Sequence, residues 1–161
     1  MSHFTSNARG QVALYAVLLF PILMLILALV LTVGTLEGTR ARTRAQLDMA
    51  ALTATQALDF AALARGEPPI LIAAEADGLA REYLVRNLST LDLPVPATSI
   101  AAAAEVNVLA PGDRDPISGE VVSVPTVSIR AVVPTRVPLL NLIGLGSMVN
   151  VSVSGSAGAR T

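Results

Sequence analysis

An uncharged apolar run near the N-terminus constrains this chain more than any other feature. No charged residue or histidine lies between Arg9 and Glu37, and nearly every residue from Val12 to Val33 is apolar. As a helix, about 22 residues at 1.5 Å per residue span roughly 33 Å, enough to cross a hydrocarbon core of about 30 Å. The run therefore predicts one transmembrane helix, with a kink at Pro21 near its middle.

Two other interpretations of this run must be weighed. A cleaved secretory signal has a shorter apolar core followed by a small-x-small site, and the residues from Thr35 to Arg40 do not form such a site. A buried core helix seldom runs this far without a polar face. We therefore expect a short polar tail over residues 1–10, a membrane anchor over 11–34 and one domain over 35–161.

The composition excludes several classes of chemistry. The chain has no cysteine and no lysine, and its one histidine, His3, precedes the anchor. Thiolate nucleophiles, Cys-ligated zinc and Ser–His or Ser–Lys catalysis in the domain are therefore excluded. The net charge of −1 gives no general attraction to nucleic acid. We expect a protein that is not an enzyme, with no catalytic residues, cofactor, metal ion or small-molecule substrate.

Helical periodicity continues after the anchor. Apolar residues recur at spacings of three and four, at Leu47, Ala50, Ala51, Ala54, Leu58, Ala61 and Ala62. Because residues 66–69 read Gly-Glu-Pro-Pro, we expect this first helix to end near Arg65. A second helix fits residues 70–87, and residues 91–96 predict an extended linker. The second helix has one apolar stripe, formed by Ala73, Ala76, Ala80, Leu84 and Leu88.

The period then changes to two. Apolar and polar residues alternate over 104–108, 126–133 and 149–154, which predicts three strands with one apolar face each. Residues 138–144 predict a short apolar helix or loop before the last strand. The expected fold is α+β, with a long N-terminal transmembrane helix extended into a small domain. That domain contains a second helix and a roughly three-stranded antiparallel sheet with one buried side.

Two charged segments leave alternatives open. Asp113, Asp115 and Glu120 lie in a Gly/Pro loop that suits a solvated turn or, less well, a calcium site. Three arginines at 40, 42 and 44 follow the anchor and suit lipid headgroups, snorkelling from the helix or an acidic partner. Residues two apart point to different sides of a helix, so the arginines do not predict a single patch.

The same arginines leave the topology open. Three arginines flank the anchor on its C-terminal side, whereas Arg9 and the α-amino group flank it on the other side. The positive-inside rule would then place the domain in the cytoplasm, although the short tail permits the opposite orientation.

Three motifs are spread over both ends of the chain. The sequence Arg9-Gly10-Gln11 leads into the apolar run. In the segment after the anchor, Gln46 and Asp48 precede the run Ala50-Ala51-Leu52. Near the C-terminus, Pro138-Leu139-Leu140 and a glycine-containing turn precede Val149-Asn150-Val151-Ser152-Val153-Ser154. Together these motifs resemble TadE/TadG-type proteins of the tight-adherence (Flp/Tad) pilus system.

The resemblance implies a single-pass inner-membrane protein with a cytoplasmic N-terminus and an extracytoplasmic domain. It implies a minor pilin or assembly factor whose partners are the inner membrane and other Tad pilus or pilin-like subunits. A polymerising pilin-like filament subunit is the alternative. Gly10 and Gln11 match a prepilin-peptidase site, but Tyr15 stands where cleaved members carry glutamate, which favours uncleaved members. Gln46, Asp48, Ala51 and Leu52 would form the family-motif surface, unless they pack on the protein's own sheet.

Overall fold

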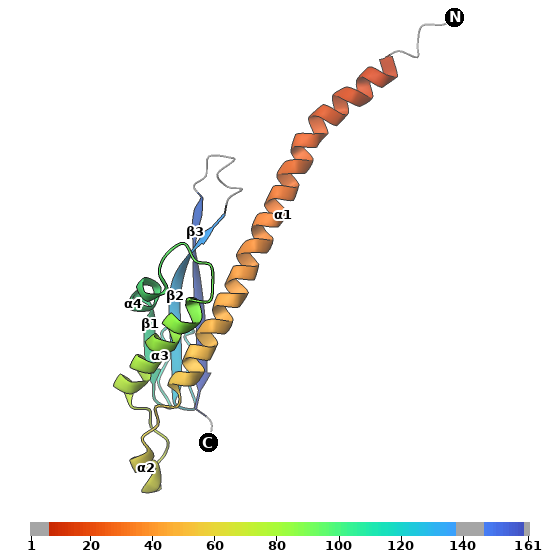
Figure 1. The fold of residues 1–161 in the computed structure, drawn as a ribbon. Helices are drawn as coiled ribbons and strands as arrows, with labels where there is room; N and C mark the ends of the chain where they lie inside the picture. The colour runs from red at the N-terminus through yellow and green to blue at the C-terminus, as the bar shows by residue number, and fades with distance from the viewer. Residues whose placement is uncertain (1–6, 138–146, 160–161) are drawn as a thin grey trace, which may run out of the picture.

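The structure, a computed structural model, describes residues 7–137 and 147–159, with side chains from residue 13 onward. Figure 1 shows one long helix that leaves a small domain of helices and strands. The elements are α1 (Asn7–Ala54), α2 (Phe60–Ala64), α3 (Ala73–Leu88), α4 (Ala97–Ala103), β1 (Glu105–Leu109), β2 (Thr126–Arg136) and β3 (Met148–Gly158). The long apolar helix, the further helices and the antiparallel sheet confirm the expected α+β fold.

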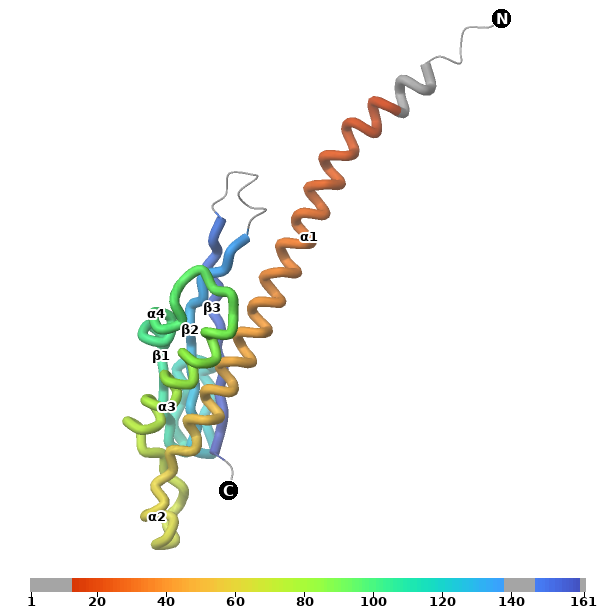
Figure 2. The backbone as a smooth tube through the Cα atoms, in the orientation of Figure 1, coloured from red at the N-terminus to blue at the C-terminus, as the bar shows by residue number. Residues whose placement is uncertain are grey.

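Helix α1 is continuous from the apolar run into the core of the domain. It has 48 residues and runs through Pro21 without a break. In Figure 2 its N-terminal half stands clear of the domain, and its C-terminal half lies along the domain. Leu47, Ala50 and Ala54 are fully buried there, on one stripe of the helix. The anchor and the domain therefore share a single helix.

The expectation that this helix continues to Arg65 is wrong. It ends at Ala54, and Leu58 instead forms an isolated antiparallel bridge with Leu71. The Thr55 hydroxyl donates to the Leu52 carbonyl at 2.7 Å, a local bond that competes with continued helix. A short helix, α2, follows, and the Asp59 carboxylate caps its start by accepting from the Ala62 N–H at 2.9 Å.

The second predicted helix is confirmed as α3, although it begins at Ala73 rather than residue 70. Four of the five stripe residues are buried: Ala76, Ala80, Leu84 and Leu88. The sequence pattern predicts no helix between α3 and β1, but α4 begins directly after Pro96 in this stretch. The Arg81 guanidinium on α3 donates to the carbonyls of Ala101 and Ala104 at 2.8 and 3.3 Å. It thereby adds a side-chain donor at the end of α4, where the Ala101 carbonyl also accepts from the Ala104 N–H at 3.4 Å.

The three strands form one antiparallel sheet in the order β1-β2-β3. In the register, Val106 lies opposite Ile129, and Ala131 lies opposite Val153. The predicted apolar face of β2 is buried, and α1 and α3 cover that side of the sheet. β3 continues to Gly158, four residues beyond the predicted end, and β2 continues through Pro134 to Arg136.

The expectation that only one side of the sheet is buried is wrong for the first half of β2. Ser128, on the opposite face, is 1% exposed, and its hydroxyl donates to Asp115 Oδ1 at 2.8 Å. The loop between β1 and β2 therefore folds over that face. Further along the same face, Val132 is 53% exposed. The predictions made for residues 138–146, including the motif Pro138-Leu139-Leu140, lie outside the described residues.

Candidate interaction surfaces

The N-terminal half of α1 is apolar on every side. The large apolar side chains from Leu14 to Val33 are 42–72% exposed. Within the described residues, α1 is the helix that is long and apolar enough to cross a membrane. Because the domain does not cover this surface, burying it requires lipid or another protein.

The motif residue Asp48 joins α1 to the edge of the sheet. Its Oδ1 accepts a hydrogen bond from the Ser156 N–H of β3 at 3.2 Å. The neighbouring Gly155 allows the two elements to approach closely, because a Cβ there would lie 2.5 Å from Asp48 Oδ1 and 2.8 Å from Asp48 N. Since β3 is an edge strand, this contact also gives a partner to one of its unpaired N–H groups.

The remaining motif residues point in different directions. Ala51 is fully buried in the core, whereas Leu52 is 54% exposed. Gln46 is half-buried, and its backbone carbonyl accepts from Asn87 Nδ2 of α3 at 3.4 Å. Asp48 and Ala51 therefore hold α1 on the domain, and Leu52 is the motif residue that is free to contact a partner.

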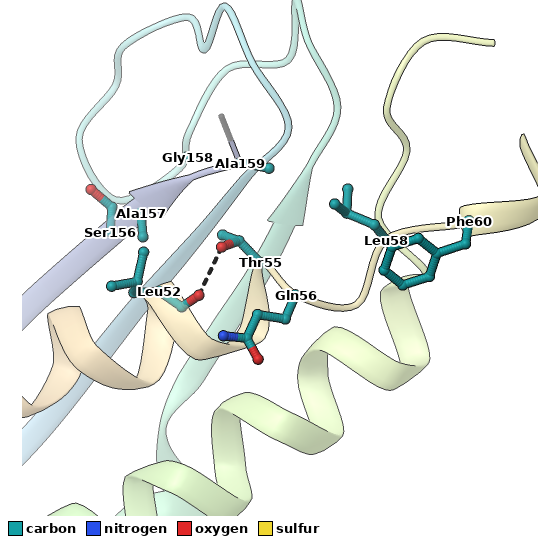
Figure 3. Close-up of a pocket in the computed structure, with 9 residues that line it drawn as sticks. All are labelled: Leu52, Thr55, Gln56, Leu58, Phe60, Ser156, Ala157, Gly158 and Ala159. Atoms are coloured by element: carbon teal, nitrogen blue, oxygen red, sulfur yellow. Dashed lines mark hydrogen bonds between the residues drawn. The ribbon is translucent and has the colours of Figure 1, made fainter. Parts of the chain in front are cut away.

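Leu52 lies at the rim of an open groove at the C-terminal end of α1, which we call the distal groove (Figure 3). The groove has a volume of about 950 Å³. Its lining is largely apolar, and Phe60 is 71% exposed. The residues that line it are Leu52, Thr55, Gln56, Leu58, Phe60, Ser156, Ala157, Gly158 and Ala159. Leu52 is the one lining residue that the sequence motifs pointed to, because the walls of the groove come from α1, from the chain leading into α2 and from β3.

The candidate peptidase site lies far from the distal groove. Gly10 and Gln11 are in the first turns of α1, at the end of the helix that stands clear of the domain. Tyr15, where cleaved pilins carry glutamate, is 61% exposed. The candidate site and the motif surface are therefore not brought together.

A second, polar groove collects arginines that the sequence did not place together. Arg40 and Arg44 of α1 line it with Arg130 of β2. Their spacing of four residues puts Arg40 and Arg44 on one side of the helix, whereas Arg42 is not among the lining residues. The first pair was detectable from that spacing, but Arg130 reaches the groove only through the tertiary fold.

The acidic residues in the loop between β1 and β2 make hydrogen bonds within the domain. Asp115 is 4% exposed and accepts hydrogen bonds from the Ile117 and Ser118 N–H groups and from the Ser128 hydroxyl. Burial alone raises the pKa of the Asp115 carboxyl group, but these hydrogen bonds outweigh it and hold the pKa below the ordinary value of 3.8. Asp113 accepts from the Ala110 N–H at 2.8 Å. Over residues 7–137 and 147–159, no group of three or more potential ligands is placed to hold a metal ion.

No family model, curated protein or solved structure matches this chain. Its relationship to known proteins therefore depends on the three motifs alone, and its function must be argued from the surfaces described above.

Proposed function

We propose that this chain is a membrane-anchored, non-enzymatic component of a Tad/Flp-type pilus or a related secretion machine, as a minor pilin or an assembly factor. The observation that carries the proposal is the division of α1 into an exposed apolar half and a half buried in the domain. The motif resemblance supports the choice of machine. In this proposal the N-terminus is cytoplasmic and the domain lies outside the inner membrane.

In the proposed mechanism, α1 anchors the protein and the distal groove binds a partner. The apolar half of α1 holds the protein in the bilayer, and the contact between Asp48 and β3 fixes the domain on the helix. The distal groove, with exposed Leu52 and Phe60 at its rim, receives an apolar segment of another pilus subunit. Aromatic side chains such as that of Phe60 are enriched at protein interfaces, and Leu52 adds exposed apolar surface beside it.

A polymerising filament subunit is the second candidate, and the same exposed half of α1 favours it. In a filament the apolar halves of neighbouring copies would pack on one another instead of on lipid. Purified filaments that contain this chain as the main component would favour the filament subunit. N-terminal mass spectrometry of the protein extracted from membranes separates a permanent anchor from a processed pilin. An intact tail indicates a permanent anchor, whereas a mature start at Gln11 indicates handling as a pilin.

Deleting the gene in its host and restoring it with variants tests the proposal. The variant Leu52→Asp places a charge at the rim of the distal groove and should abolish surface pili seen by electron microscopy. Met49→Asp is the matched control, because Met49 is 59% exposed on the same helix but does not line the groove. Normal piliation in the deletion strain would refute the pilus role, and equal piliation by both variants would refute the role of the groove.

A further inference from the structure

The polar groove on the anchor side of the domain, which we call the arginine groove, is strongly electropositive. Its volume is about 390 Å³, and no acidic residue lines it. The lining residues are Arg40, Arg44, Arg130, Ser152, Val153 and Ser154. Three arginines and two serines therefore line one opening, and all five side chains carry hydrogen-bond donors.

The arginines differ in how far their charge is already compensated. Arg130 donates to the Ile117 carbonyl at 3.2 Å and lies 3.7 Å from Glu105 Oε2, contacts that hold its side chain in place. Arg40 and Arg44 are exposed and have no acidic partner among the described residues. The groove therefore suits an anion with several oxygen atoms, and the planar guanidinium fork matches phosphate well.

The position of the groove along α1 indicates where that phosphate would come from. Arg40 and Arg44 lie six and ten residues beyond Gly34, or about 9 and 15 Å along the helix axis. The headgroup layer extends roughly 5–8 Å beyond the hydrocarbon core. Because side chains of a helix lean toward its N-terminus, both arginines point back toward the anchor and this layer.

Strand β3 gives a second measure of the same depth. Gly155 lies against Asp48, and the seven residues from there back to Met148 cover about 23 Å of strand. On α1, the 14 residues from Asp48 back to Gly34 cover about 21 Å. The beginning of β3 is therefore level with the end of the anchor, and in Figure 1 the strand starts on the side of the N-terminal half of α1 and runs away from it toward the C-terminus. The groove residues Ser152 and Ser154, three and one residues before Gly155, therefore lie about 11 and 18 Å beyond the level of Gly34, at the depth of Arg40 and Arg44.

We propose that the arginine groove binds the phosphate group of an anionic phospholipid in the leaflet next to the domain. This inference rests on the membrane anchor in the proposed function and is independent of the pilus role. A bound headgroup would connect α1, β2 and β3 to the bilayer surface at a second point, beside the anchor itself.

Native mass spectrometry of the full chain, released from nanodiscs of mixed phosphatidylglycerol and phosphatidylcholine, tests the proposal. We expect the protein to retain phosphatidylglycerol in preference to phosphatidylcholine. Arg44→Gln should lower that occupancy about ten-fold, as expected for loss of one charged hydrogen-bonding group. Arg42→Gln is the matched control, with the same change of charge on the same helix outside the groove, and should lower it less than about two-fold.

Each contrary outcome has a distinct meaning. Equal losses of retained phosphatidylglycerol in the two variants would refute a defined site. They would show that anionic lipid is attracted equally by any arginine near the membrane surface. Inorganic phosphate that binds in an Arg44-dependent way, with no retained lipid, would refute the lipid as the ligand. Failure of the chain to enter nanodiscs would refute the anchor, whereas entry without lipid preference would refute the groove alone. Circular dichroism melting of both variants checks that the exposed substitutions leave the fold intact.

Discussion

The contact between Gly155 and Asp48 gives the sharpest prediction. In Gly155→Ala the new Cβ would lie 2.5 Å from Asp48 Oδ1, 2.8 Å from Asp48 N and 2.9 Å from Leu47 Cβ. Asp48 N is a backbone atom, and the position of Leu47 Cβ is fixed by the backbone of α1. Rotating a side chain therefore cannot relieve the overlap with these two atoms. The helix and the strand must move apart, which weakens the Ser156 N–H hydrogen bond to Asp48 as well.

Overpacking of this kind costs about 1–3 kcal/mol, and a weakened hydrogen bond adds about 1 kcal/mol. We therefore expect the unfolding free energy to fall by about 2–4 kcal/mol. For a domain of this size, that lowers Tm by roughly 7–15 °C. Thermal and urea unfolding of the full chain in detergent micelles, followed by circular dichroism, measures the change.

Gly78→Ala is the matched control for this prediction. Gly78 lies inside α3, and a Cβ there would have nothing within 4 Å. Alanine is favoured over glycine in a helix by about 0.5–1 kcal/mol, so the control should be slightly more stable than the unmodified chain. Equal stability of the Gly155→Ala variant and the unmodified chain would refute the close approach of α1 to β3.

Two further predictions concern polar contacts of the domain. Because the folded-state pKa of Asp115 lies below its ordinary value of 3.8, its contribution to stability is fully present above that value and is lost as the pH falls through the folded pKa. Urea unfolding from pH 7 to pH 2 should therefore show a steeper acid loss in the unmodified chain than in Asp115→Asn; parallel curves would contradict this. Arg81→Ala should lower the unfolding free energy by about 1–2 kcal/mol, because the Ala101 and Ala104 carbonyls lose the charged side-chain donor that joins α3 to the end of α4. The exposed Arg86→Ala is its control, and equal effects in the two variants would show that the α3–α4 contact is not specific.

Elements with a strong local pattern could be predicted from the sequence. The stripe of Ala76, Ala80, Leu84 and Leu88 and the alternation along β2 were sufficient for α3 and the sheet. Both patterns reflect a helix or strand with one face against the core, and that requirement is visible within about ten residues of sequence.

Features set by distant residues could not be predicted in the same way. The alanine pattern continues beyond Ala54, but pairing of Leu58 with Leu71 ends α1 there. Asp115 read as a surface turn because its partner Ser128 lies 13 residues away on another element. The arginine groove was missed for the same reason, since Arg130 joins Arg40 and Arg44 only across the sheet.

In the proposed function, the continuity of α1 makes the helix a rigid connection between the bilayer and the distal groove. Leu52 lies 18 residues beyond Gly34, or about 27 Å along the axis. A change of about 10° in the tilt of the anchor would therefore displace the distal groove by about 5 Å parallel to the membrane. Because helix tilt adjusts to hydrocarbon thickness, the thickness of the bilayer would set the position at which the domain meets its partner.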